Sequence, residues 1–175
     1  MKFDAVIIGG GSSGCSAASR LASEGKRVCL VTEGLTLDSL EMEKPYQRLA
    51  ALTAQGVAVL RGDSVAATCM ERGRAAAVRT RNGVVLEADS FYLATGRFFS
   101  RGLVADMDGI YEPLFGADVD FPADRSLWFN PDFFAPQPFE SFGVKTSEDG
   151  RIYVGGKLVE NVFAIGKILG INAGK

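Results

Sequence analysis

The sequence predicts an α/β domain with a Rossmann-like parallel sheet that continues into a β-meander. Three observations lead to this fold class. The apolar run at residues 5–8 is typical of a strand buried on both faces, and it leads directly into a glycine-rich turn. An amphipathic helix at 16–24 is followed by a second apolar strand at 28–31. From residue 56 onward, short β-rich runs alternate with turn residues.

The turn after the first strand carries the main functional signal. Gly9, Gly11 and Gly14 match the G-x-G-x-x-G spacing of dinucleotide-binding folds. The first glycine allows a tight turn, the second lets the backbone approach a pyrophosphate, and the third lets the helix lie close to the strand. Amides at the start of the helix favour bound negative charge. This turn is therefore predicted to bind phosphate groups.

A competing motif occupies the same residues, because Gly10, Ser12 and Gly14 also spell the G-x-S-x-G nucleophile elbow of hydrolases. The chain contains no histidine, so Ser12 has no imidazole to accept its proton. We therefore expect Ser12 and Ser13 to satisfy backbone amides or a ligand phosphate at the start of the helix.

Composition narrows the function classes. The 175 residues include 19 basic and 21 acidic side chains, a net charge of −2, so nucleic-acid binding is not expected. Cys15, Cys29 and Cys69 are far apart in apolar surroundings, which predicts reduced, buried thiols and no metal site. The N-terminus lacks the pattern of a signal peptide, so a cytoplasmic location is expected. The length is typical of one domain, residues 1–175.

The end of the second strand is where dinucleotide-binding folds place an acid that binds the ribose hydroxyl groups. Counting from the glycines places Thr32 at this position and Glu33 one residue later, so both are candidates. A helix is predicted over about 40–53. The interval between Gly34 and Gly56 is too short for a large substrate-binding insertion.

The later part of the chain predicts further strands. Runs at 57–60, 65–68, 75–80 and 84–86 are predicted to form a strand and a meander, and Asn82 and Gly83 mark a hairpin turn. Residues 89–96 predict another buried strand, which ends in Ala94, Thr95 and Gly96.

In this order, the glycine-rich unit, the meander, residues 94–96 and a late Phe-Ala-Ile-Gly at 163–166 resemble the flavoproteins with two dinucleotide folds. The resemblance implies that the first glycines bind the FAD pyrophosphate and that the later turns bring backbone to the flavin. The residues it assigns to cofactor contact are Gly9, Gly11, Gly14, Val65, Thr95, Gly96 and Gly166.

Segments 98–103, 109–113, 132–138 and 160–166 resemble the B subunit of anaerobic glycerol-3-phosphate dehydrogenase. This family implies FAD or FMN as cofactor, a second flavoprotein subunit, and an iron–sulfur subunit that holds the assembly at the inner membrane. It also implies a longer chain, with a substrate insertion and a final helix after the last glycine turn. A flavin domain without them is expected to be inactive alone.

The family's chemistry would move a hydride from C2 of glycerol 3-phosphate to flavin N5 while a base accepts the hydroxyl proton. Glu112, Asp132 or a lysine is the candidate base, because the chain has no histidine. The candidate phosphate ligands are Arg97, Arg101 and Arg125. An alternative function is a catalytically silent flavin- or nucleotide-binding scaffold that docks partner subunits.

Residues 97–150 are predicted to form a long covering segment. Nine of the twelve phenylalanines, the only tryptophan and five of the six prolines lie between residues 98 and 142. Such aromatic density argues against disorder. Trp128, Phe133 and Phe134 are expected either to pack over the sheet or to line the flavin pocket, and the sequence leaves both open.

Overall fold

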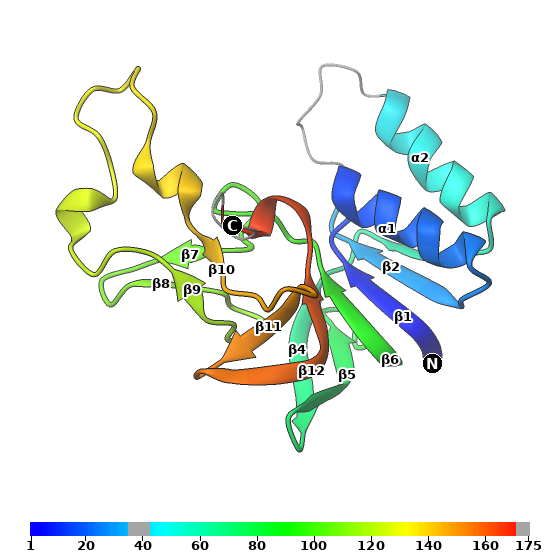
Figure 1. Ribbon diagram of the computed structural model, residues 1–175. Helices are drawn as coiled ribbons and strands as arrows, with labels where there is room; N and C mark the ends of the chain where they lie inside the picture. Colours follow the sequence, from blue (N-terminus) through cyan, green and yellow to red (C-terminus); the bar gives the residue numbers. More distant parts are fainter. Residues whose placement is uncertain (35–42, 171–175) are drawn as a thin grey trace.

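The computed structural model describes residues 1–34 and 43–170, built around one twisted sheet (Figure 1). Five strands of this sheet are parallel in the order β3-β2-β1-β6-β12, and β11 adds an antiparallel edge. The predicted α/β class with a parallel sheet is therefore confirmed. These strands are β1 (Lys2–Ile8), β2 (Val28–Thr32), β3 (Ala58–Arg61), β6 (Val85–Leu93), β11 (Arg151–Val154) and β12 (Lys157–Ala164).

The first βαβ unit is as predicted, with α1 (Ser12–Ser23) between β1 and β2. Successive side chains of β1 enter opposite faces of the sheet, which is why the run is apolar throughout. Ala5 and Ile7 pack under α1 and α2 (Glu43–Ala54), while Val6 and Ile8 pack under the opposite layer. The predicted start of the second helix, at 40–42, lies outside the described residues.

The opposite layer begins with the predicted meander, in which β4 (Val65–Glu71) and β5 (Arg74–Thr80) form a hairpin that pairs with β6. The separate strands predicted at 84–86 and 89–96 are wrong, because β6 runs unbroken from Val85 to Leu93. The charged residues Glu87 and Asp89 interrupt the apolar pattern, which made one strand look like two in the sequence. Pairing with β5 over residues 85–87 and with β1 over residues 87–93 keeps the strand continuous.

Residues 97–150 contain short elements that stand to one side of the sheet (Figure 1). Trp128 packs edge-to-face on Phe121 against the core, so the packing alternative holds for this residue. Phe133 and Phe134 are 84% and 93% exposed, and neither expectation holds for them. The elements are β7 (Val104–Ala105), β8 (Ile110–Tyr111), β9 (Val119–Asp120), β10 (Gly143–Val144) and the 3-10 helices Arg125–Leu127 and Pro138–Ser141.

Two of the three thiols match the sequence prediction. Cys15 and Cys29 are buried, and burial raises the pKa of Cys29 to about 12. Cys69 is exposed on β4, so its predicted burial is wrong. Within 1–34 and 43–170, no group of side chains is arranged to hold a metal ion, and no helix is long and apolar enough to cross a membrane.

Asn161 lies where β6 changes its pairing partner from β5 to β12. On one side β6 pairs first with β5 and then with β12. Between these pairings, the buried Asn161 side chain accepts a hydrogen bond from the Ala75 amide at 2.8 Å and donates to the Ala75 carbonyl at 2.8 Å. It also donates to the Asp89 carbonyl at 3.1 Å. One side chain thus substitutes for the missing backbone ladder.

Asn161→Ala should lower the free energy of unfolding by about 3 kcal/mol, because it leaves buried backbone groups of Ala75 and Asp89 without partners. Urea denaturation of the two proteins measures this difference. The control is Glu160→Ala on the same strand, which removes an exposed ion pair with Arg74 and should cost no more than about 0.5 kcal/mol. Equal effects of the two substitutions would contradict the bridging role of Asn161.

Candidate functional site

A cleft of about 860 Å³ opens at the carboxyl ends of β1, β2 and β6. The chain leaves β1 toward β2 on one side and leaves β6 toward β12 on the other, so this is the switch point of the sheet. Ligands of open α/β sheets bind at such points. The cleft is lined by residues 8–13, 31–34, 63–66, 81, 94–96, 99–101, 104, 113–114 and 167.

The first and third glycines of the motif are required by the fold itself. Gly9 has a φ of 114°, and a Cβ there would clash with the Ala94 carbonyl on the neighbouring strand end. A Cβ at Gly14 would clash with the Gly9 carbonyl. Gly14 therefore lies behind the cleft wall rather than in it. These two contacts bring the start of α1 against the ends of β1 and β6.

Gly11 differs from these two glycines. Its φ of −70° suits any residue, and a Cβ built there has no protein atom within 4 Å. The residue lines the cleft and caps α1 without a side-chain hydrogen bond. Neither strain nor packing among the described residues explains a glycine here. The open space beside Gly11 fits the predicted pyrophosphate role, which needs close approach of a ligand to this backbone.

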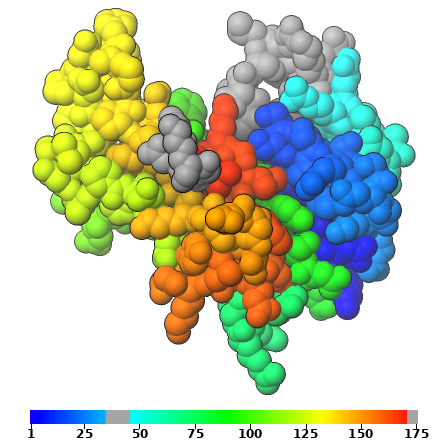
Figure 2. All heavy atoms as spheres, viewed as in Figure 1, coloured from blue at the N-terminus to red at the C-terminus, as the bar shows by residue number. Residues whose placement is uncertain are grey.

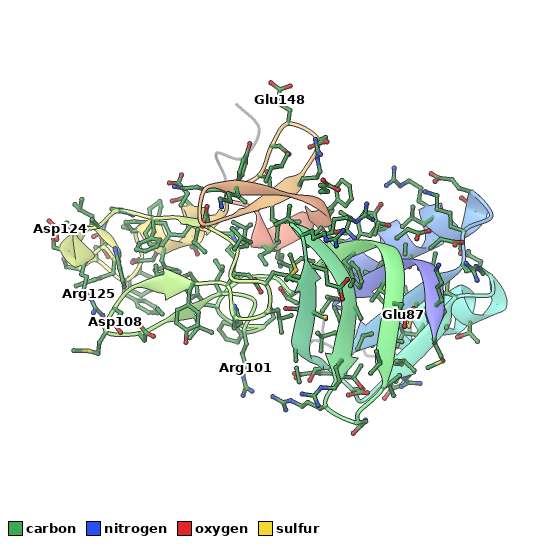
Figure 3. The ribbon with its side chains drawn as sticks, turned by 90° about the horizontal axis from the view of Figure 1, so that it is seen from below. Glu87, Arg101, Asp108, Asp124, Arg125 and Glu148 are labelled. Atoms are coloured by element: carbon green, nitrogen blue, oxygen red, sulfur yellow. The ribbon has the colours of Figure 1, made fainter. Side chains whose placement is uncertain are left out.

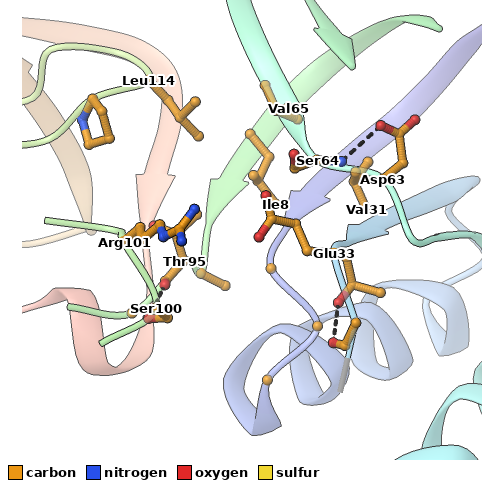
Figure 4. A pocket seen from close by; sticks show the side chains of 18 of the residues that line it. Ile8, Val31, Glu33, Asp63, Ser64, Val65, Thr95, Ser100, Arg101 and Leu114 are labelled. Atoms are coloured by element: carbon orange, nitrogen blue, oxygen red, sulfur yellow. Dashed lines mark hydrogen bonds between the residues drawn. The ribbon is translucent and has the colours of Figure 1, made fainter. Parts of the chain in front are cut away.

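The end of β2 separates the two candidates for the ribose contact. The Thr32 hydroxyl is buried against Gly10 and donates to the Gly34 carbonyl at 3.0 Å. Glu33 is exposed and lines the cleft, on the same side as Asp63 and Val65 (Figure 4). The structure thus places the Glu33 carboxylate in the cleft, while the Thr32 hydroxyl is already hydrogen-bonded within the turn.

Asp63 was not predicted as a site residue, although it lines the cleft. Its carboxylate accepts hydrogen bonds from the Ser64 amide at 2.8 Å and the Asn82 amide at 3.3 Å. Burial alone would raise the pKa of Asp63, but hydrogen bonds from Thr80, Asn82 and Ser64 outweigh it and lower the pKa below its usual range. Asp63 therefore fixes the turn that leads into β4 and shapes this wall of the cleft.

The opposite wall is the loop after β6, which carries Thr95, Gly96 and Arg101 (Figure 4). The Ser100 hydroxyl donates to the Thr95 carbonyl, and the Gly102 amide donates to the Arg97 carbonyl at 2.9 Å. Arg101 has a φ of 59°, which is unfavourable for a side chain of this size and is held by these bonds. The loop thereby keeps a guanidinium group at the cleft.

The last predicted turn also reaches this region. Gly166 has a φ of 74°, and a Cβ there would clash with Ser13 at the start of α1. Gly166 itself lies behind the wall, and the next residue, Lys167, lines the cleft. The three turns that the sequence singled out, at 9–14, 94–96 and 166, therefore meet at one place.

Other predicted residues lie elsewhere. The Arg97 guanidinium donates to the Lys167 carbonyl at 2.6 Å and is not part of the cleft wall. Arg125 lies over the Trp128 ring, with 4.8 Å between guanidinium carbon and ring centre. Asp132 accepts from the Phe134 amide at 3.0 Å, on the outer end of the covering segment. The structure brings none of these three to the site.

Glu112, a candidate base, is buried outside the cleft. Its carboxylate accepts from the Leu114 amide at 2.8 Å and the Phe115 amide at 2.7 Å. Burial raises its pKa, and these backbone hydrogen bonds only partly oppose the effect. The carboxylate positions the turn that brings Pro113 and Leu114 to the cleft, where sequence reasoning did not expect a wall. The one sequence signal for this wall was the apolar pair Pro113 and Leu114, which directly follows Glu112.

Comparison with known proteins identifies the family. The sequence profile of the FAD binding domain family matches residues 4–39 and 40–174. The chain belongs to this family. Of the two cofactors that the sequence left open, FAD is the one that an FAD binding domain takes. The turn at Gly11 fits this cofactor, because it has space for a ligand and no packing reason to be glycine.

The predicted resemblance to one dehydrogenase component is also confirmed. This FAD binding domain is 40% identical over 127 residues to the B subunit of anaerobic glycerol-3-phosphate dehydrogenase from Yersinia pestis, covering 71% of this chain and 28% of the relative. The protein of the same name from Actinobacillus succinogenes is 38% identical over 132 residues, 71% of this chain and 29% of the relative. The chain spans less than a third of the length of these relatives.

Among solved structures, PqsL of P. aeruginosa in complex with 2-aminobenzoylacetate aligns with a TM-score of 0.48 and 14% identity. The alignment covers 55% of this chain and 43% of PqsL. The FAD-dependent halogenase CndH aligns with a TM-score of 0.45 and 20% identity, over 54% of this chain and 37% of CndH.

Asp63→Ala should lower stability, because the Ser64 and Asn82 amides lose their acceptor. The folded-state pKa of Asp63 lies below the ordinary value of an aspartate, so its contribution is present above that ordinary pKa and is lost as pH falls through the lower, folded pKa. Urea midpoints of wild type and variant should therefore differ at neutral pH and converge in acid. A difference that stays constant with pH would contradict this assignment.

Proposed function

We propose that this chain is the FAD-binding part of an oxidoreductase like the B subunit of anaerobic glycerol-3-phosphate dehydrogenase. The complete protein would pass reducing equivalents from glycerol 3-phosphate to a quinone-linked chain. The observation that carries the proposal is the meeting of three glycine turns around one cleft, in a chain about 40% identical to that relative. Bound FAD supplies the hydride acceptor.

The charges of the cleft orient the cofactor. Ribose hydroxyl groups donate hydrogen bonds, and the exposed carboxylate in the wall at the end of β2 is Glu33. The adenosine half is therefore assigned to the wall of Glu33 and the Val65 backbone. The pyrophosphate is assigned to Gly9, Gly11, Ser12 and Ser13, where α1 begins. The flavin half then extends toward Thr95, Gly96 and Lys167.

Substrate phosphate is assigned to Arg101, because of the three arginines predicted for this role it is the one in the cleft wall. Arg101 lies beside Thr95 (Figure 4), on the wall to which the flavin half is assigned, and a guanidinium there would attract an anionic substrate. The loop that holds Arg101 at a positive φ fixes the backbone position from which the guanidinium reaches the cleft. Further subunits and a peripheral place at the inner membrane belong to this same proposal.

A second function is a catalytically silent FAD-binding scaffold that docks partner subunits. The observation that favours it is the position of the candidate bases. The Glu112 carboxylate accepts hydrogen bonds from backbone amides outside the cleft, and Asp132 lies far out on the covering segment. Lys167 is the candidate lysine that lines the described cleft.

Gly11→Ala should mainly weaken FAD binding, whereas Gly14→Ala should mainly destabilise the fold. Gly11→Ala meets no protein atom and should lower the free energy of unfolding by no more than about 1 kcal/mol, the loss expected at a helix N-cap, while FAD affinity falls at least about tenfold. Gly14→Ala forces a Cβ into the Gly9 carbonyl and should destabilise the fold directly. Thermal unfolding without FAD and fluorescence titration with FAD separate the two. FAD binding unchanged in Gly11→Ala would contradict the pyrophosphate assignment.

Flavin bleaching tests the chemistry. The full-length FAD-loaded protein should lose its visible flavin absorbance when glycerol 3-phosphate is added without oxygen. Arg101→Ala should raise the half-saturating substrate concentration about tenfold or more, because a charge-assisted contact to phosphate is lost. Arg125→Ala, on the covering segment, is the matched control and should leave the half-saturating substrate concentration unchanged. A coloured protein that glycerol 3-phosphate does not bleach would support the scaffold instead.

A further inference from the structure

Residues 104–142, here called the arm, form a lobe that stands away from the sheet (Figure 2). Eight carboxylate residues and one basic residue, Arg125, lie in this segment, although the whole chain has nearly equal numbers of the two charges. Asp108, Asp124 and Arg125 lie near its outer end (Figure 3). The arm is thus the most acidic part of the molecule. The eight are Asp106, Asp108, Glu112, Asp118, Asp120, Asp124, Asp132 and Glu140.

The outer end of the arm also exposes large apolar side chains, here called the apolar tip. Phe133 and Phe134 are almost fully exposed and stack edge-to-face with 5.5 Å between ring centres. Burial of apolar rings of this size is favourable, so leaving both in water is costly. Contiguous exposed apolar groups commonly mark interaction surfaces. The tip consists of Leu127, Phe129, Phe133 and Phe134.

The tip is ordered by its own polar groups. The Trp128 indole donates to the Pro122 carbonyl at 2.7 Å, and the Asn130 amide donates to the Gln137 side chain at 2.9 Å. The Gln137 amide group donates in turn to the Asp132 carbonyl at 3.0 Å. These bonds fix the backbone that presents the two phenylalanines. Because the loop is held this way, little entropy is lost when a partner covers it.

The geometry points to a docking surface for another protein subunit, one that carries an apolar groove bordered by lysine and arginine. This inference rests on the proposed function, in which the chain is part of a multi-subunit enzyme. The apolar tip would fill the groove, and Asp108, Asp124 and Glu140 would face the basic border. An anionic membrane would repel these carboxylates, and so would a second copy of the same acidic arm.

Photo-crosslinking tests the docking surface in the native assembly. Phe134 of the full-length protein is replaced by p-benzoylphenylalanine in its own cells, and the crosslinked peptide is sequenced by mass spectrometry. The expected result is one protein partner, attached through an apolar peptide with an excess of Lys and Arg. Crosslinks to lipid, to a second copy, or to nothing would overturn the inference.

Charge reversal tests whether the carboxylates of the arm contribute to partner binding, or whether the apolar tip alone accounts for the crosslink. Asp108→Lys/Glu140→Lys should lower the crosslink yield about tenfold or more. The matched control, Met70→Ser/Glu87→Lys, changes an exposed apolar and an exposed acidic residue on the sheet and should leave the yield unchanged. A yield that charge reversal does not lower would also overturn the inference. FAD content is measured in every variant, because loss of flavin throughout would count against the proposed function instead.

Discussion

Close contact between backbone segments at the ends of β1 and β6 is the constraint on which the site depends. Gly9 lies against the Ala94 carbonyl, and Gly14 lies against Gly9, so strand, turn and helix meet without side chains between them. Gly166 makes a similar contact with Ser13. A Cβ at any of the three would separate the elements that it joins. The cleft follows from these contacts, because side chains that would otherwise fill the switch point are absent there.

The glycine spacing and the alternation of apolar runs were enough to predict the parallel sheet, the first βαβ unit and the meander. They also predicted which turns would meet, since carboxyl ends of parallel strands share one edge. The motif also gave Gly11 and Gly14 different roles, one toward a ligand and one in helix–strand packing, and their surroundings differ accordingly. One meets open space and the other meets a carbonyl oxygen.

What the sequence could not predict depended on long-range contacts. Glu112 carries the residue type of a base, and only the amides of Leu114 and Phe115 show that it is a structural acceptor. Asp63 lies between a strand and a meander, and nothing local indicates that Asn82 caps its carboxylate. The continuity of β6 likewise depends on β1, which is more than 80 residues away along the chain.

Strand β6 also bears on how a cofactor can enter. It pairs with β1, which pairs in turn with β2, so the strand ends that carry opposite walls of the cleft belong to one continuous hydrogen-bonded ribbon. Along this ribbon there is no seam about which two halves could rotate apart. Changes in the width of the opening must therefore come from the short loops at its rim, such as the one that holds Arg101. The sheet is the rigid base of the entrance, and admission of a large ligand depends on the rim alone.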